Sequence, residues 1–134
     1  MNIFLDTNVV LDYILGREPH YEASSGAIKA ALEGEHTLYV SANCITDIFY
    51  IAKRYGIGTK DIREQLENML SFMDIIGVTR SDILKTLKIE CDDFEDALQA
   101  QCAAKTKADY IITRDVGFDG YGIKVVSPQE FIKL

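Results

Sequence analysis

The chain has 134 residues, of which 48% are apolar and 26% charged, a composition typical of a soluble globular protein. No apolar run approaches the roughly 20 residues of a membrane span, and the N-terminus lacks a signal peptide's features, so we expect no membrane association. Three widely spaced cysteines suit neither a zinc site nor a disulfide framework, which predicts a reduced, cytoplasmic protein. The net charge of −7 argues slightly against a high-affinity, non-specific nucleic-acid binder.

Apolar periodicity predicts an alternation of short strands and helices. In chain order, we expect a strand at 2–5, helices at 8–15 and 19–34, a strand at 37–40, helices at 42–55 and from 59 onward, a strand at 75–78, helices at 81–88 and 93–107, strands at 110–113 and 123–126, and a final helical turn from 127. This order predicts one α/β domain over 1–134, with about five parallel strands and helices on both faces of the sheet.

The helix ends carry recognisable signals. Gly16 is expected to end the first helix, and the second is expected to start near Pro19, because proline is favoured in a first helical turn. Thr59 and Ser81 stand where the fourth and fifth helices are predicted to begin. Ser127 and Glu130 have the spacing of a capping box at the last helix.

Two aspartates follow short apolar strands. Asp6 comes directly after the run Ile3–Leu5, and Asp115 follows the run 110–113 with one residue between. The carboxyl ends of parallel strands border the crevice where open α/β sheets bind ligands. Each aspartate also has a simpler interpretation, Asp6 as a helix cap and Asp115 as a turn former.

A dense group of acids precedes the predicted helix 93–107. The stretch 92–96 contains four acids in five positions, more than helix capping needs. Asp96 shares a helix face with small alanines that would let the helix approach the sheet closely, so it is the best ligand candidate, with Asp93 second. We expect Asp92 and Glu95 to act as caps.

Asp47 lies inside the predicted helix 42–55, where aspartate is a weak helix former. Alone, it is better explained as a solvated residue paired with Lys53 or Arg54. Together with the other acids it points to a site, because gathered carboxylates repel one another unless a cation offsets their charge. The four candidate acids are Asp6, Asp47, Asp96 and Asp115.

Basic and aromatic residues give a weaker signal. The cations are scattered along the sequence, and only a fold could gather some of them along a groove: Arg17, Lys53, Arg54, Lys60, Arg63, Lys105, Lys107 and Arg114. Four aromatic residues could stack on bases, although such residues are more often part of a core or its rim: Tyr13, Tyr50, Tyr55 and Phe118.

Taken together, four segments resemble a PIN domain along essentially the whole chain. They are Ile3-Phe4-Leu5-Asp6-Thr7-Asn8-Val9-Val10, Ile45-Thr46-Asp47-Ile48, Asp96-Ala97-Leu98-Gln99-Ala100, and Thr113-Arg114-Asp115 with Phe118. Each segment alone is unspecific, whereas all four in this order and spacing are specific. The resemblance implies a three-layer α/β/α sandwich and a Mg²⁺- or Mn²⁺-dependent nuclease acting on single-stranded RNA.

The resemblance also implies roles for particular residues. Asp6, Asp96 and Asp115 would bind the metal, one or two ions, with Asn8 and Thr113 in support. Asp47 would belong to the catalytic group, although the family usually has a glutamate at this place. Asp93 is expected near the site, and Arg114 to contact RNA phosphates.

The leading hypothesis is therefore a small ribonuclease like the VapC-type toxins of bacterial toxin–antitoxin pairs, which implies a homodimer inhibited by an antitoxin protein. The alternative is a PIN-fold module that binds RNA or protein without turnover. A haloacid-dehalogenase-type phosphotransferase fits less well, because its chemistry needs an aspartate where this chain has Asn8.

Overall fold

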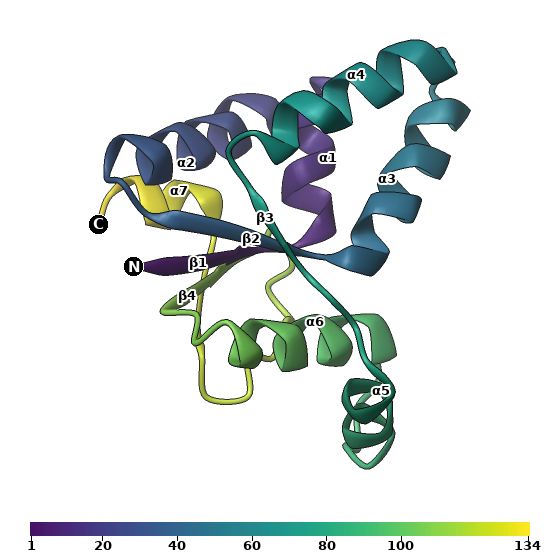
Figure 1. The fold of residues 1–134 in the computed structure, drawn as a ribbon. Coiled ribbons are helices and arrows are strands. Elements are labelled where there is room, and N and C mark those ends of the chain that lie inside the picture. The colour runs from purple at the N-terminus through teal and green to yellow at the C-terminus, as the bar shows by residue number, and fades with distance from the viewer.

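The computed structural model describes residues 1–134, and its elements follow the predicted order (Figure 1). They are β1 Asn2–Leu5, α1 Thr7–Leu15, α2 Tyr21–Glu33, β2 Thr37–Ser41, α3 Ala42–Arg54, α4 Thr59–Leu70, β3 Asp74–Ile76, α5 Arg80–Leu87, α6 Phe94–Lys105, β4 Tyr110–Ile112, β5 Lys124–Val126 and α7 Pro128–Ile132. None of these helices combines the length and the apolar character that crossing a bilayer requires.

All five strands form one parallel sheet, as predicted, and the sheet has the order β3-β2-β1-β4-β5. The central strand β1 pairs on one side with β2, where Phe4 faces Tyr39, and on the other with β4, where Phe4 faces Ile111. The chain runs outward from β1 through β2 to β3, then returns to the opposite side of β1 with β4. The strand order therefore reverses between β1 and β4, and the crevice at such a reversal is where open α/β sheets bind ligands.

Helices cover both faces of the sheet and complete the three layers. Figure 1 shows α1 to α4 with α7 on one side of the strands, and α5 with α6 on the other. Alternate residues of β1 enter two cores: Ile3 and Leu5 belong to the larger one, and Phe4 to the smaller one. In the smaller core Phe4 packs with Ala100 and Ala103 of α6, whose small side chains allow the close approach that the sequence predicted.

Two predicted helix ends are confirmed. Gly16 follows α1 in the left-handed conformation, with φ of 62°, and its N–H donates to the carbonyl of Asp12. At α7, the Ser127 hydroxyl accepts a hydrogen bond from Glu130 N, while the Glu130 carboxylate accepts one from Ser127 N. This reciprocal pair is the predicted capping box.

Two other bounds differ from the predicted ones. The helix expected to start near Pro19 begins two residues later, at Tyr21, because His20 and Tyr21 both donate to the carbonyl of Arg17 and form a turn first. The third strand is Asp74–Ile76 instead of 75–78. It pairs only with β2, and the pairing ends where β2 ends and the chain enters α3.

The expected cap of α4 and the expected start of α5 are also displaced by one residue. Gly58, and not Thr59, holds the cap position of α4, since its carbonyl accepts the first helical hydrogen bond, from Ile62 N. At α5, the helix begins at Arg80, one residue before the expected Ser81, and Thr79 forms a capping box with Asp82. Asp82 lies three residues after Thr79, the spacing that a capping box requires.

A buried ion-pair network connects α1, α2 and the segment that follows β4. Asp12 of α1 is fully buried and accepts hydrogen bonds from Ser24 of α2 at 2.9 Å and from two arginines. Arg17 reaches it with Nη2 at 2.9 Å, and Arg114, just after β4, reaches it with Nε at 2.6 Å. Arg17 also donates to the backbone carbonyl of Asn8 at 3.2 Å. One carboxylate thus fixes the start of α1 relative to the end of β4.

We expect Asp12→Ala to lower the free energy of unfolding by about 2–4 kcal/mol, because it leaves two partly buried guanidinium groups without a counter-charge. Glu33→Ala is the matched control. Glu33 pairs with Lys29 at 3.9 Å, and both side chains are exposed, so its removal should change stability by less than about 0.5 kcal/mol. Urea denaturation of the two variants measures the difference. Equal effects would show that the Asp12 network does not stabilise the fold.

Candidate active site

Asp6 lies at the carboxyl end of the central strand and is 3% exposed. Its backbone N–H donates to Ile112 at 3.0 Å, which extends the β1–β4 pairing to the end of the sheet. Asp6 occupies the cap position of α1, yet its side chain makes no capping hydrogen bond. The simpler interpretation of Asp6 as a capping side chain is therefore wrong, and its carboxylate is directed elsewhere.

Two buried side chains hold the Asp6 carboxylate. Gln99 of α6 donates from Nε2 to Oδ1 at 3.0 Å, and Thr113, just after β4, donates from Oγ1 to Oδ2 at 2.7 Å. Gln99 is 1% and Thr113 3% exposed. Each carboxylate oxygen thus accepts one hydrogen bond from the protein and keeps lone-pair capacity for a further partner. This arrangement fixes the orientation of Asp6 in the absence of any ligand.

Asp115 and Asp96 approach each other beside Asp6. The Asp115 backbone N–H donates to the Thr113 hydroxyl at 3.0 Å, and its Oδ1 accepts from Gly117 N at 2.9 Å. Asp115 therefore forms the predicted turn and still lines the same pocket as Asp6. Asp96, in the first turn of α6, lies within hydrogen-bonding reach of the Asp115 carboxyl group.

The acidic residues at the start of α6 have other roles than those expected from the sequence. Asp93, and not Asp92 or Glu95, caps the helix, because its Oδ1 accepts from Asp96 N at 3.0 Å. Glu95 instead lies within hydrogen-bonding reach of Asp47 on α3. Spacing alone favoured Asp92 with Glu95, but the helix begins one residue later than a cap at Asp92 would require.

Asp47 is half-buried on α3 and does not pair with Lys53 or Arg54, so that alternative is wrong. Asn8 lines the pocket from the first turn of α1, where its Oδ1 lies 3.4 Å from Arg17 Nη2. Arg114 points to Asp12, a partner that the sequence did not suggest. Its contact with RNA stays a prediction.

These acids form one acidic pocket at the β1–β4 edge of the sheet. Six carboxylates line it: Asp6, Asp47, Asp93, Glu95, Asp96 and Asp115. The ion pairs of the chain all lie elsewhere, on Asp12, Glu33 and Asp82, so no lysine, arginine or histidine neutralises the six. The pocket therefore concentrates negative charge without a protein counter-charge.

The electrostatic consequence appears in two pKa values. Partial burial, followed by repulsion from Asp93, Asp6 and Asp115, raises the pKa of Asp96 from 3.8 to about 7. Partial burial and the charge of Asp47 raise the pKa of Glu95 as well. At neutral pH the pocket therefore favours binding a proton or a cation.

The donor set fits a hard divalent cation. Carboxylates dominate the pocket, neither histidine nor cysteine lines it, and oxygen ligands are those that Mg²⁺ and Mn²⁺ prefer. The Oε1 atom of Gln99 is buried beside Asp6 without a hydrogen-bond partner, so it can accept from a ligand or water. No three acidic, histidine or cysteine side chains are already arranged as a closed metal-binding group. The residues thus suit an ion by chemistry without forming a preset coordination shell.

The sequence did not identify Gln99 and Glu95 as parts of this pocket. Gln99 lies three residues after Asp96, hence on the same helix face, and is the one large polar residue among the small ones there. That contrast in size and polarity was an available signal. Glu95 carried no such signal, because its contact with Asp47 comes from another helix.

Because Asp96 keeps its proton up to about pH 7 in the folded protein but loses it near 3.8 when unfolded, we expect metal-free stability to fall as pH rises through this window. Asp96→Asn removes the ionisable group and with it this pH-dependent loss of stability. Above pH 7 the variant should exceed wild type by about 1 kcal/mol, a value reduced for solvent screening, and the gain should shrink toward pH 4.

Denaturation of both proteins in EDTA across pH measures this difference. Asp92→Asn, at an exposed position of the same acidic stretch, is the control and should show a smaller gain. A gain for Asp96→Asn that does not depend on pH would contradict the raised pKa.

Solved structures of similar fold include bacterial toxin–antitoxin proteins. The Rickettsia felis VapBC2 structure, bound to a DNA fragment from its promoter, has a TM-score of 0.68 and 16% identity, covering 95% of this chain and 98% of that one. Mycobacterium tuberculosis VapC20, a toxin that cleaves the sarcin-ricin loop, has a TM-score of 0.69 and 14% identity over 90% and 95%. FitAB bound to an IR36 DNA fragment has a TM-score of 0.69 and 21% identity over 95% of both chains.

At these identities the structures show a shared fold. No curated protein sequence matches the chain. The sequence profile of the PIN domain, however, matches residues 2–117, which include every acid of the pocket. The fold, the order of the site residues and this match agree: the chain belongs to the PIN domain family.

Proposed function

We propose that residues 1–134 act as a metal-dependent endoribonuclease that hydrolyses phosphodiester bonds of single-stranded RNA. The observation that carries the proposal is the acidic pocket itself. Six carboxylates share it without a basic partner, and Asp6 at its base is held by two buried donors. A protein gains nothing in stability from such a cluster, because like charges repel and burial adds a desolvation cost. Cation binding would give the cluster a function.

In this proposal Asp6, Asp96 and Asp115 hold one or two Mg²⁺ or Mn²⁺ ions. When bound, such an ion would supply Lewis-acid activation of water and of the scissile phosphate. Gln99 and Thr113 keep Asp6 in one orientation, so no reorganisation of this carboxylate is needed.

The remaining polar residues surround this group. Asp47 of α3 and Glu95 of α6 line the pocket within hydrogen-bonding reach of each other, where they would orient a water or a second ion. Asp93 shapes the pocket through its cap on Asp96 N. Asn8 supplies a polar edge on the α1 side.

We further propose that the chain is a toxin of a bacterial toxin–antitoxin pair, active in the cytoplasm. The support is the fold shared with toxin–antitoxin structures and with the structure of a toxin that cleaves the sarcin-ricin loop. This role implies an antitoxin partner that covers the acidic pocket. It also implies a homodimer, which sedimentation analysis of the purified chain would test.

The other function to consider is a PIN-fold module that binds RNA or protein without turnover. The aspartate at position 47, where the family usually has glutamate, is the observation that favours it. Asp47 nevertheless reaches Glu95 and lines the pocket, so the shorter side chain has not left the site. Metal binding without RNA cleavage would support this alternative.

Purified protein should cleave a mixed-sequence single-stranded RNA with Mg²⁺ or Mn²⁺ and not with EDTA. Asp6→Asn and Asp96→Asn should each reduce the rate by at least about 100-fold, since each removes a charged ligand. Gel analysis of a labelled RNA measures the rate.

Glu22→Gln, an equal charge change on the exposed surface of α2, is the control and should cleave like wild type. Cleavage that survives both EDTA and the two aspartate substitutions would show that a contaminant or a different site cuts the RNA.

A further inference from the structure

Four basic residues lie around the turn between α3 and α4. The α3–α4 hairpin, residues 42–70, contains four cations and four acids, but around its turn, residues 50–63, the four cations stand with only one acid in a chain of net charge −7. All four cations are exposed, and none takes part in an ion pair. They are Lys53, Arg54, Lys60 and Arg63. Such unpaired cations are available to a polyanion.

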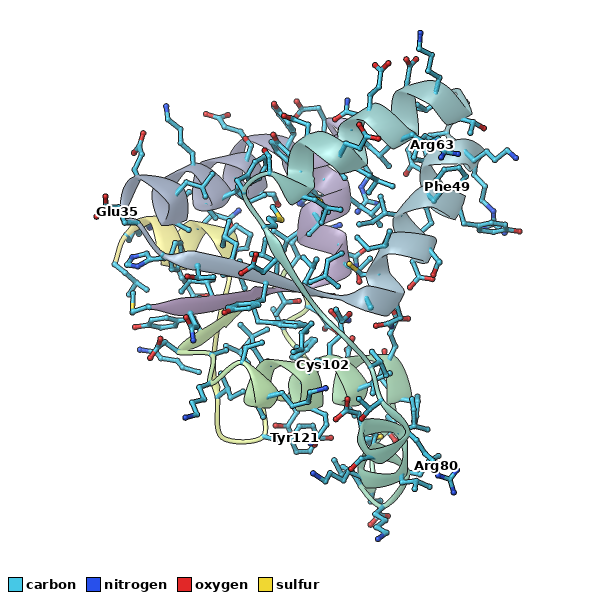
Figure 2. All side chains as sticks on the ribbon, viewed as in Figure 1. Glu35, Phe49, Arg63, Arg80, Cys102 and Tyr121 are labelled. Atoms are coloured by element: carbon cyan, nitrogen blue, oxygen red, sulfur yellow. The ribbon has the colours of Figure 1, made fainter.

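This hairpin adjoins the acidic pocket through one face of α3. Asp47 and Ile51 line the pocket, and Arg54, seven residues after Asp47, lies on the same helix face about 10 Å further along at 1.5 Å per residue. Figure 1 shows α3 running from the edge of the sheet outward to its turn with α4. Figure 2 shows Phe49 and Arg63 toward the outer part of this hairpin, well away from Glu35 and Arg80.

An exposed aromatic ring lies on the same path. Tyr50, one helical turn from Asp47, is 61% exposed, although large aromatic side chains are usually covered. The guanidinium of Arg54 lies over its ring, with Cζ 4.7 Å from the ring centroid. A ring with a cation on it, next to further cations, is the combination that binds unpaired bases and their phosphates.

We infer that the tract formed by Tyr50, Lys53, Arg54, Lys60 and Arg63 binds single-stranded RNA and leads it into the acidic pocket. Tyr50 stacks on a base, and Arg54 with its basic neighbours contacts the phosphates. The inference rests on the proposed nuclease function and states which surface of the protein holds the RNA substrate. It also accounts for how an acidic chain holds a polyanion, because the attraction comes from one side of the pocket and not from the overall charge.

The test measures binding of a short labelled single-stranded RNA in EDTA by fluorescence anisotropy, and KM and kcat with Mg²⁺. Tyr50→Ala should weaken RNA binding by about 5-fold or more, whereas Tyr50→Phe should bind like wild type, because stacking needs the ring and not the hydroxyl. Arg54→Gln should weaken binding at low salt and reduce its salt dependence by about one phosphate contact. Lys29→Gln on α2 is the charge-matched control and should change binding by less than about 2-fold. Tyr50→Ala and Arg54→Gln should raise KM more than they lower kcat.

The outcomes separate this inference from the proposed function. If wild type cleaves RNA but Tyr50→Ala and Arg54→Gln match it in binding and KM, the tract is not the RNA path and the nuclease proposal stands. If both substitutions dissociate a dimer in sedimentation analysis while RNA binding is unchanged, the tract is a contact between copies of the chain. If wild type neither binds nor cleaves RNA, both proposals fail.

Discussion

The structure of the site depends on how one carboxylate is held. Asp6 directly follows the central strand β1, and its two oxygens accept hydrogen bonds from Gln99 of α6 and from Thr113, just after the neighbouring strand β4. Because both donors are buried, the orientation of Asp6 does not depend on solvent or on its acidic neighbours. Asp96 and Asp115 then approach a fixed group. Their mutual repulsion is the energetic cost of the pocket, and a bound cation would offset it.

The rest of the fold supplies the geometry around that carboxylate. Two cores, one on each face, press α1 and α6 against the central strands and bring their N-terminal turns to the same edge of the sheet. The buried Asp12 adds a second constraint, since Arg114 joins it directly before Asp115 and Arg17 joins it beside Asn8. The two residues that border the pocket from α1 and β4 are thus tied to one ionic centre. The α3–α4 hairpin is part of the larger core through residues such as Ile48 and Ile62, whereas the basic side chains around its turn are exposed.

The sequence predicted the order of the elements, the parallel sheet and the three layers, because apolar runs and helix stripes depend on local periodicity. It did not predict details that depend on tertiary partners. The length of β3 depends on how far it can pair with β2. The cap of α6 is Asp93 because the helix begins at Phe94. The same distinction between local and tertiary features holds for the residues of the pocket. Asp6 and Asp115 were indicated by their place after strands, whereas the hydrogen bond from Gln99, the contact between Glu95 and Asp47, and the pairing of Arg114 with Asp12 all join distant segments.

The central claim is that the acidic pocket binds a divalent cation through Asp6, Asp96 and Asp115. Crystals of the protein grown with Mn²⁺ and measured for anomalous scattering would test it most directly. The account predicts an anomalous peak in the pocket, at about 2.0–2.3 Å from oxygens of Asp6 and of Asp96 or Asp115. The peak should be lost in crystals of Asp6→Asn. A well-ordered pocket without a peak at saturating Mn²⁺, or a peak bound only by residues outside it, would contradict the account.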